Sequence, residues 1–260
     1  MVCIVCWLVV AFVVVGAAAC GSARAREAAP RPPQQRECSN EQKGTEHMKA
    51  DASGKGHVHG SHAHADHAHG TFSGAERWSE RFDDPARDAW QRPDEVLRAL
   101  ALAPSMTVAD IGAGTGYFAV RLARAVPQGN VIATDIEPDM VRYLEERARR
   151  ERLPNLRAVH ASHDRSGLAP NSVDAILIVH VWHHLGDRAC YARDLASALR
   201  PGGRLFAVDF SPAAHRGPPM HMRLAPETLI AELAGAGLTA AVSPIALPDQ
   251  YIVEARKPIP

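Results

Sequence analysis

Three glycines at alternating positions constrain this sequence more than any other feature. Gly112, Gly114 and Gly116 follow a short apolar run, Thr107–Ile111, and precede a segment typical of a helix, Tyr117–Ala125. Glycine lets the backbone turn tightly and lets a ligand approach the main chain. The start of a helix presents unpaired N–H groups and the positive end of its dipole. The segment therefore predicts a strand, a ligand-binding turn and a helix, in that order.

Strand-like and helix-like segments alternate through most of residues 75–260, which we expect to form one domain. The pattern predicts strands at 107–111, 130–135, 157–161, 173–181 and 204–210, and helices from residue 93 and at 117–125, 139–152, 187–199 and 226–236. Two closing segments, near 238–245 and 251–255, have no helix between them and predict an antiparallel hairpin. The expected fold is α/β: a doubly wound, mostly parallel seven-stranded sheet with an antiparallel C-terminal hairpin.

The glycine spacing differs from two common nucleotide-binding patterns. A nicotinamide fingerprint needs its third glycine at position 117, where Tyr117 stands, and no Gly-Lys-Ser/Thr follows as in a phosphate loop. Asp135 ends the next predicted strand, where a carboxylate can accept hydrogen bonds from both ribose hydroxyls of an adenosine ligand. The turn and this acid together predict a site for an adenosine-containing ligand.

Three segments of the sequence resemble class I S-adenosylmethionine-dependent methyltransferases, which are Rossmann-like. They are residues 108–118, the strand that ends in Asp135, and Leu-Arg-Pro-Gly-Gly-Arg-Leu at 199–205. The pattern is most similar to that of ubiquinone and menaquinone biosynthesis methyltransferases. The resemblance implies that S-adenosylmethionine is the cofactor and that its methyl group passes in line to a small-molecule acceptor. It also implies the cofactor-binding residues, which are Asp110, Gly112, Gly114 and Gly116 at the methionine end, Asp135 at the ribose and Asp164 near the adenine.

Acceptors in open α/β sheets bind beyond the carboxyl ends of the strands. The residues that follow the fourth predicted strand are therefore candidates: His183 or His184 as a general base, with His180 and Trp182 in the acceptor pocket. Asp209, at the end of the next strand, is a further catalytic candidate, and Tyr117 is expected to line the pocket. One of the two histidines can instead be a buried, hydrogen-bonded support.

The aromatic residues Trp78, Phe82 and Trp90 precede the predicted core. They are expected either to form a lid over the cofactor and acceptor or to pack on the outside of the sheet. Lys plus Arg and Asp plus Glu both total 29, and a nucleic-acid binder usually has a basic excess. No Asn/Asp-Pro-Pro-Tyr/Phe follows the fourth strand, so DNA N-methylation is disfavoured and we expect no nucleic-acid partner.

Residues 2–19 are an uncharged run that is followed by Cys20. Three alanines before Cys20 resemble the lipobox of bacterial lipoproteins, so residues 1–20 predict a cleaved signal or a membrane anchor in the cell envelope. Four arginines after the run favour an alternative, an uncleaved reverse anchor that keeps the domain in the cytoplasm. A misassigned start codon is the third interpretation.

Residues 21–74 lack apolar periodicity and predict a disordered tether. It carries three His-x-His pairs that suit Cu(II), Ni(II) or Zn(II): His57 with His59, His62 with His64, and His67 with His69. The same residues also fit a solvated spacer. An alternative function follows, an envelope metal-binding protein on an inactive or repurposed methyltransferase fold, because S-adenosylmethionine is made in the cytoplasm. The sequence gives no indication of the oligomeric state.

Overall fold

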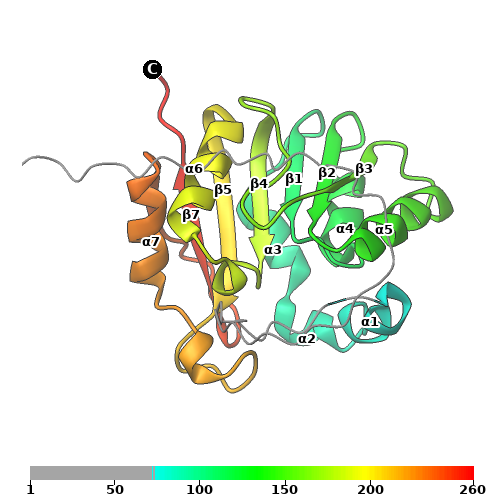
Figure 1. The fold of residues 1–260 in the computed structure, drawn as a ribbon, viewed down its shortest axis with the longest axis horizontal. Helices are drawn as coiled ribbons and strands as arrows, with labels where there is room; N and C mark the ends of the chain where they lie inside the picture. Colours follow the sequence, from blue (N-terminus) through cyan, green and yellow to red (C-terminus); the bar gives the residue numbers. More distant parts are fainter. Residues whose placement is uncertain (1–71, 73) are drawn as a thin grey trace, which may run out of the picture. The chain divides into compact units, whose positions relative to one another are not determined.

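The central element is a seven-stranded sheet with the strand order β3-β2-β1-β4-β5-β7-β6. A computed structural model describes Phe72 and residues 74–260, and Figure 1 shows the sheet with its helices. The strands are β1 (Thr107–Ile111), β2 (Asn130–Asp135), β3 (Leu156–His160), β4 (Val173–Val179), β5 (Leu199–Phe210), β6 (Thr239–Val242) and β7 (Gln250–Arg256).

The helices of the described residues are α1 (Ala75–Phe82), α2 (Arg87–Gln91), α3 (Pro93–Leu100), α4 (Tyr117–Ala125), α5 (Pro138–Arg150), α6 (Arg188–Ala198) and α7 (Pro226–Gly235). Two short 3-10 helices, η1 (Trp182–His184) and η2 (Met220–Met222), follow β4 and β5. No helix in this part of the chain is long and apolar enough to cross a membrane.

Strands β1 to β5 pair in parallel, while β7 is antiparallel to both β5 and β6. This confirms the predicted fold, a mostly parallel seven-stranded sheet with an antiparallel C-terminal hairpin. The chain passes from β1 outward to β2 and β3 and then returns to β4 beside β1. The strand order thus reverses between β1 and β4, and ligands of open α/β sheets bind at such a point.

Strand β5 begins earlier than predicted. Residue 199 was expected to end a helix and the strand to begin at residue 204, yet Leu199 pairs with Val173 across an irregularity in the β4–β5 ladder. The pairing brings the backbone around Gly203 close to β4, because a Cβ there would lie 3.1 Å from the carbonyl oxygen of Asp174. The Pro-Gly-Gly segment is therefore part of a bulged strand.

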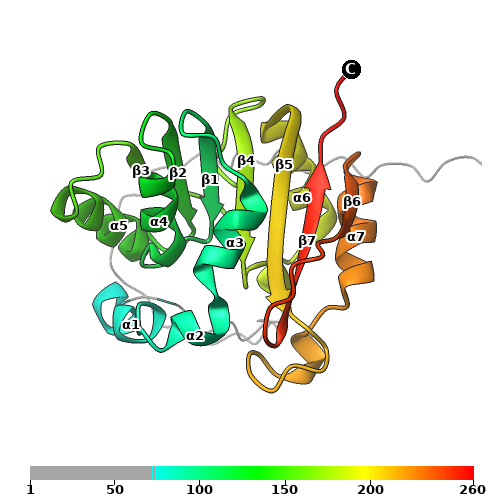
Figure 2. The ribbon, with the colours of Figure 1, turned by 180° about the vertical axis from the view of Figure 1, so that it is seen from behind.

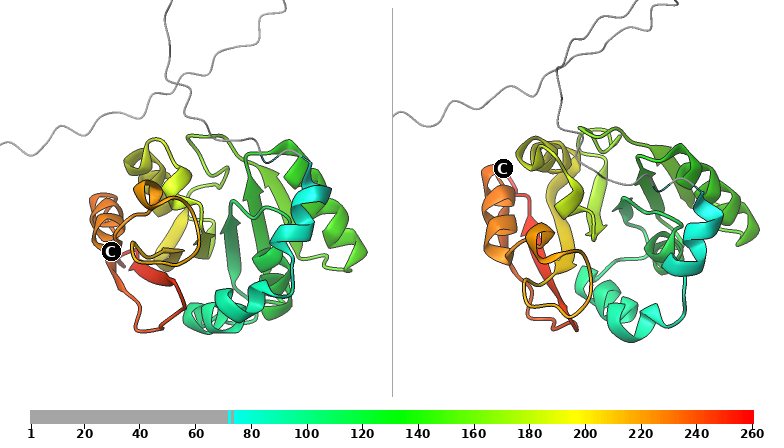
Figure 3. Two further views of the ribbon diagram at one scale, coloured as in Figure 1. Left: turned by 90° about the horizontal axis from the view of Figure 1, so that it is seen from below. Right: turned by 60° about the horizontal axis from the view of Figure 1, so that its bottom comes forward.

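Two apolar layers cover the faces of the sheet. Side chains alternate between faces along a strand, so Val108 and Leu177 pack with α3, α4 and α5, whereas Ile111 and Ile176 pack with α6 and α7. Figure 3 shows helices on both sides of the sheet. The candidate site lies outside both layers, at the edge of the sheet where the parallel strands have their carboxyl ends.

Helices α1 and α2 lie along the edge of the sheet at which β4 and β5 end (Figures 1 and 2). The β5–α7 connection with η2 lies at the same edge. The predicted signal or anchor and the His pairs of the tether, from His57 to His69, lie outside the described residues.

Candidate active site

The glycine turn between β1 and α4 requires glycine at three positions. Gly112, Gly114 and Gly116 have φ values of 64°, 54° and 95°, which side chains with a Cβ rarely adopt. A Cβ on Gly112 would overlap the side chain of Val181, and one on Gly116 would lie 2.8 Å from Leu144. Gly116 is also the N-cap of α4, and no side chain caps that helix. The turn therefore lets a ligand approach the backbone at the start of α4, where no side chain caps the helix.

Asp135, at the end of β2, lies directly beside this turn. Its carboxylate accepts hydrogen bonds from the N–H groups of Gly114 at 2.8 Å and Glu137 at 3.0 Å. Burial of the carboxylate raises its pKa, and the bonds from these N–H groups oppose the rise. The structure thus brings the predicted ribose-binding acid to the predicted cofactor turn.

Asp110, in β1, is 3% exposed, and burial raises the pKa of its carboxyl to about 7. Its Oδ2 atom is buried and has no hydrogen-bond partner in the described part of the chain. The hydroxyls of Thr115 and Thr134 are buried and unpartnered in the same way. Because buried polar atoms are nearly always paired, three such atoms around one turn indicate a site for a polar ligand.

Asp164 lies on the loop that follows β3. It is exposed in a turn after β3 that is closed by hydrogen bonds between the backbones of Ser162 and Arg165. Because it is exposed on this loop, Asp164 fits only a position at the periphery of the site.

His183 and Asp209 meet at the ends of β4 and β5. The Nδ1 atom of His183 lies 2.8 Å from Oδ1 and 3.0 Å from Oδ2 of Asp209, and the side chains are 3% and 2% exposed. The Phe210 N–H also donates to Asp209 Oδ1 at 2.8 Å. The ring of His184 lies 4.2 Å from that of His183. The two catalytic candidates from separate strands thus form a buried histidine–carboxylate pair.

His180, the first residue beyond β4, has a left-handed backbone with φ of 58°. Its Nε2 atom lies 3.1 Å from Oε1 of Gln250, which also accepts from Nε2 of Gln91. Its ring stacks 4.2 Å from that of Phe210 and lies 6.0 Å from that of Trp90. Burial lowers the pKa of His180 to about 3, so the ring is neutral at physiological pH.

The other two predicted pocket residues have packing partners of their own. Trp182 is buried against α6 and α7, and its Nε1–H donates to Glu232 at 2.7 Å. The hydroxyl of Tyr117 donates to Asp88, and its ring lies between the guanidinium groups of Arg87 at 3.9 Å and Arg121 at 4.0 Å. These contacts hold both side chains in place, and their role in the acceptor pocket stays a prediction.

The aromatic residues of α1 lie at the carboxyl edge of the sheet, where the lid alternative expects them. A Cβ on Gly114 would lie 3.4 Å from the Phe82 ring, and Trp78 stacks 5.2 Å from Phe82. Phe72 lies 5.0 Å from Trp78 and 6.1 Å from His184. These three rings extend from the glycine turn to the histidines of η1.

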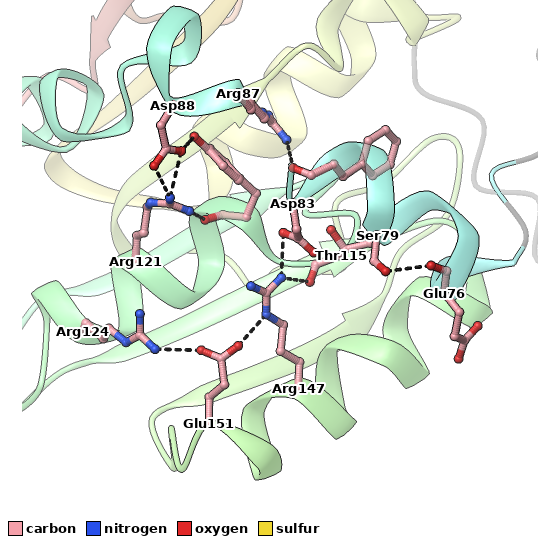
Figure 4. Close-up of polar contacts among 12 residues, drawn as sticks. Glu76, Ser79, Asp83, Arg87, Asp88, Thr115, Arg121, Arg124, Arg147 and Glu151 are labelled. Carbon is pink, nitrogen blue, oxygen red and sulfur yellow. Dashed lines mark hydrogen bonds and ion pairs between the residues drawn. The ribbon is translucent and has the colours of Figure 1, made fainter. Parts of the chain in front are cut away.

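Ion pairs attach the segment from α1 to α2 to helices α5 and α4 (Figure 4). Arg147 of α5 donates through Nη1 to Asp83 and to the carbonyl oxygen of Thr115, at 2.8 Å each. On the other side, Arg121 of α4 lies 3.0 Å from Asp88. Sequence analysis missed Arg147 and Asp83, because no local pattern marks two residues 64 positions apart as partners.

Among the described residues, no group of three or more His, Cys, Asp or Glu side chains could hold a metal ion. The residues predicted to bind metal, from His57 to His69, lie outside that part of the chain.

Comparison with known proteins identifies the central part of this chain. A family model described as a methyltransferase domain matches residues 108–203. An uncharacterized methyltransferase of Mycobacterium tuberculosis is 39% identical over 117 residues, which are 45% of this chain and 44% of that protein. A ubiquinone/menaquinone biosynthesis C-methyltransferase of Pasteurella multocida is 32% identical over 106 residues, 40% of each chain. The matched part thus spans less than half the length of these relatives.

A solved structure shows a likeness over a larger part of the chain. The crystal structure of a SAM dependent methyltransferase from Aquifex aeolicus has a TM-score of 0.64 and 25% sequence identity. The match covers 70% of this chain and 97% of that chain. The glycine turn, Asp135 and the strand order described above all lie within a fold of this class.

Proposed function

This chain contains the domain and the fold of S-adenosylmethionine-dependent methyltransferases, and we propose that it transfers a methyl group from S-adenosylmethionine to a small organic acceptor. The observation that carries the proposal is the glycine turn with Asp135 hydrogen-bonded to it and the unpartnered Asp110 beside it. The small-molecule acceptor is supported by the resemblance to methyltransferases of quinone biosynthesis.

The residues at the turn fit the cofactor. Asp135 offers carboxylate oxygens for the ribose hydroxyls, and the unpartnered Oδ2 of Asp110 offers an acceptor for the α-amino group. Gly112, Gly114 and Gly116 let the ligand approach the main chain at the start of α4. Asp164 is proposed for the adenine end on the resemblance alone. When bound, the cofactor supplies a methyl group on a positively charged sulfur that is already activated for displacement.

The protein's own task is to align the acceptor and to exclude water, and good alignment is worth roughly 7–11 kcal/mol. The Phe82 ring lies near Gly114 of the turn, and Phe72 and Trp78 pack on Phe82. These rings are proposed to shield the bound cofactor from solvent. His180 and its neighbours Trp90 and Phe210 provide a neutral wall near the ends of β4 and β5.

A proton must leave the acceptor when the attacking atom is a hydroxyl oxygen. A carboxylate beside Nδ1 of His183 favours the tautomer with its hydrogen on Nδ1, and Nε2 of that tautomer can accept the proton. His183 is therefore proposed as the general base, and Asp209 as the residue that orients it. His184, packed against His183 and Phe72, is a second candidate for contact with the acceptor.

Calorimetric titration of the full chain with S-adenosylhomocysteine, the demethylated cofactor, tests the proposal. The wild type is expected to bind one equivalent. Asp135→Asn is expected to bind at least about tenfold more weakly, because it loses the negative charge and replaces one of the two acceptor oxygens with an NH2 group. Glu145→Gln, an exposed change on α5, is the control and should leave the affinity unchanged. Absence of binding by the wild type, or equal binding by Asp135→Asn, would contradict the proposal.

We also propose that the N-terminus associates with the membrane of the bacterial cell envelope, as residues 1–20 suggest. The need for a cytoplasmic cofactor supports the alternative, in which an anchored domain faces the cytoplasm. Protease treatment of intact spheroplasts separates the two, because only an outward-facing domain is digested. No observation on the described residues favours the metal-binding alternative.

A further inference from the structure

A chain of hydrogen bonds leads from Arg87 of α2 to His180 at the end of β4. Arg87 Nη2 donates to Oε1 of Gln91 at 3.2 Å, and Nε2 of Gln91 donates to Oε1 of Gln250 at 2.8 Å. The same Oε1 atom of Gln250 lies 3.1 Å from Nε2 of His180. Gln91 is 0% and Gln250 is 6% exposed, so bulk water does not compete for these bonds.

The guanidinium group sets the direction of every bond in this chain. It has only N–H donors and no acceptor, so the Gln91 atom that faces it must be the amide oxygen. Gln91 therefore turns its NH2 group toward Gln250, and Gln250 must meet that group with its own oxygen. Because this oxygen also faces His180, Nε2 of the ring has to be the donor. A bond from Gln250 Nε2 to the Trp90 carbonyl oxygen, at 3.4 Å, agrees with this orientation.

The ring of His180 consequently has its lone pair on Nδ1, because a neutral imidazole carries one hydrogen. Burial lowers the pKa of His180 to about 3, so the ring keeps its neutral form at physiological pH. No hydrogen bond among the described residues uses this Nδ1 atom, and it is not one of their fully buried atoms that lack a partner. The lone pair is therefore open to a hydrogen-bond donor.

His180 lies beside the proposed catalytic pair. Asp209 and His183 are close enough for their charges to shift the pKa of His180. The His180 ring also stacks on that of Phe210, whose N–H donates to Asp209. The open nitrogen thus belongs to the same strand ends as the proposed general base.

We infer that His180 accepts a hydrogen bond from the methyl acceptor through Nδ1, and that Gln91 and Gln250 are positioning residues that fix the tautomer of its ring. The inference rests on the proposed function and names one property of the acceptor. Besides the atom that is methylated, the acceptor carries a second hydroxyl or N–H group. The two glutamines lie on either side of the matched domain at residues 108–203, and α2 and β7 bring them together.

Nitrogen-15 NMR of the full chain with labelled histidine tests the tautomer, because the ring nitrogens have different shifts in the two neutral forms. The signals of His180 are identified by their loss in His180→Gln. In the wild type, this ring is expected to keep its hydrogen on Nε2 between about pH 5 and pH 8. A hydrogen on Nδ1, or a mixture of both forms, would overturn the inference and leave the proposed function intact.

Gln91→Glu should move the hydrogen of His180 from Nε2 to Nδ1. The new carboxylate keeps the bond from Arg87 but has no donor, so Gln250 turns its NH2 group toward the carboxylate and toward Nε2 of the ring, which then accepts. Gln128→Glu, an exposed change between α4 and β2, is the matched control and should keep the hydrogen on Nε2. An unchanged tautomer in Gln91→Glu would show that the glutamines do not control the ring.

Pairs of phenols that differ in one group test the contact with the acceptor. One member carries a second hydroxyl or an amino group, and the other carries a methyl group in its place. With the wild type, the member with the second donor should have a kcat/KM about tenfold to a hundredfold higher, because only this member pairs with the lone pair. Gln91→Glu should reduce the preference to about twofold or less and leave the affinity for S-adenosylhomocysteine unchanged.

Equal kcat/KM values of the wild type within the methylated pairs would overturn the contact, and so would a preference that survives in Gln91→Glu. Methylation of none of these compounds by a protein that binds S-adenosylhomocysteine would contradict the assigned acceptor. If the wild type does not bind S-adenosylhomocysteine, the proposed function fails and the contact with the acceptor fails with it. The NMR measurement detects the tautomer in either case, so the two failures are distinguishable.

Discussion

His183 Nδ1 lies 2.8 Å from Asp209 Oδ1, and this bond between two buried side chains joins a 3-10 helix after β4 to the end of β5. An acid that accepts from Nδ1 selects the ring tautomer whose Nε2 can take a proton.

Asp209→Asn should therefore lower kcat with hydroxyl acceptors by about 10²- to 10⁴-fold, while the affinity for S-adenosylhomocysteine stays unchanged. The measurement is transfer of a labelled methyl group from S-adenosylmethionine to a panel of hydroxylated aromatic compounds, followed by steady-state kinetics on those accepted. Asp94→Asn serves as the control, because Asp94 is an exposed aspartate on α3 with no assigned part in the site. An unchanged kcat would rule out orientation of His183 as the role of Asp209.

Cofactor affinity should depend on the protonation of Asp110. Burial raises the pKa of this carboxyl to about 7, and only its charged form attracts the cationic α-amino group. The affinity for S-adenosylhomocysteine is thus expected to rise between pH 6 and pH 8, by at most about tenfold per pH unit below that pKa. Calorimetry across this range measures the effect. Asp110→Asn should bind weakly with no such rise, and a rise of the same size in that variant would assign the titration to another group.

The same aspartate should destabilise the protein without ligand. Its folded pKa of about 7 exceeds the ordinary 3.8, so the native state holds more protons between these values and the free energy of unfolding falls as pH rises through them. Above pH 7 the loss is complete, at about 1.4 kcal/mol per pKa unit. Asp110→Asn should consequently unfold at higher urea concentration than the wild type at pH 8 and should lose this advantage near pH 4. Greater stability of the wild type at pH 8 would show that the charge is compensated.

Gly112→Ala should disrupt both stability and binding. The added Cβ would overlap Val181, and the backbone φ of 64° is strained for alanine, so we expect a loss of about 2–4 kcal/mol in the free energy of unfolding. Chemical denaturation measures the loss, and calorimetry measures the cofactor affinity. Gly235→Ala is the matched control, because a Cβ at that helical position meets no atom within 4 Å. In Gly235→Ala, the free energy of unfolding should stay unchanged or rise slightly. Equal free energies of unfolding for the two variants would mean that the turn accommodates the added Cβ without strain.

Local patterns predicted the elements around the turn well. The bounds of β1, α4 and β2 are those expected from the sequence, because apolar runs, glycines and a terminal acid mark their ends within a few residues. The start of β5 was predicted five residues late, since Leu199 joins the strand only through its pairing with Val173 across a bulge. That pairing depends on the neighbouring strand and leaves no local signal.

The sequence by itself determined the α/β fold, the glycine turn and the placement of Asp110 and Asp135 at the ends of adjacent strands, because these follow from short-range steric and apolar patterns. Only the tertiary structure decided which histidine contacts Asp209, and which buried polar atoms around the glycine turn stay without a partner. These relationships join residues from separate elements, and strand order and helix packing bring such residues together only when the whole sheet has formed.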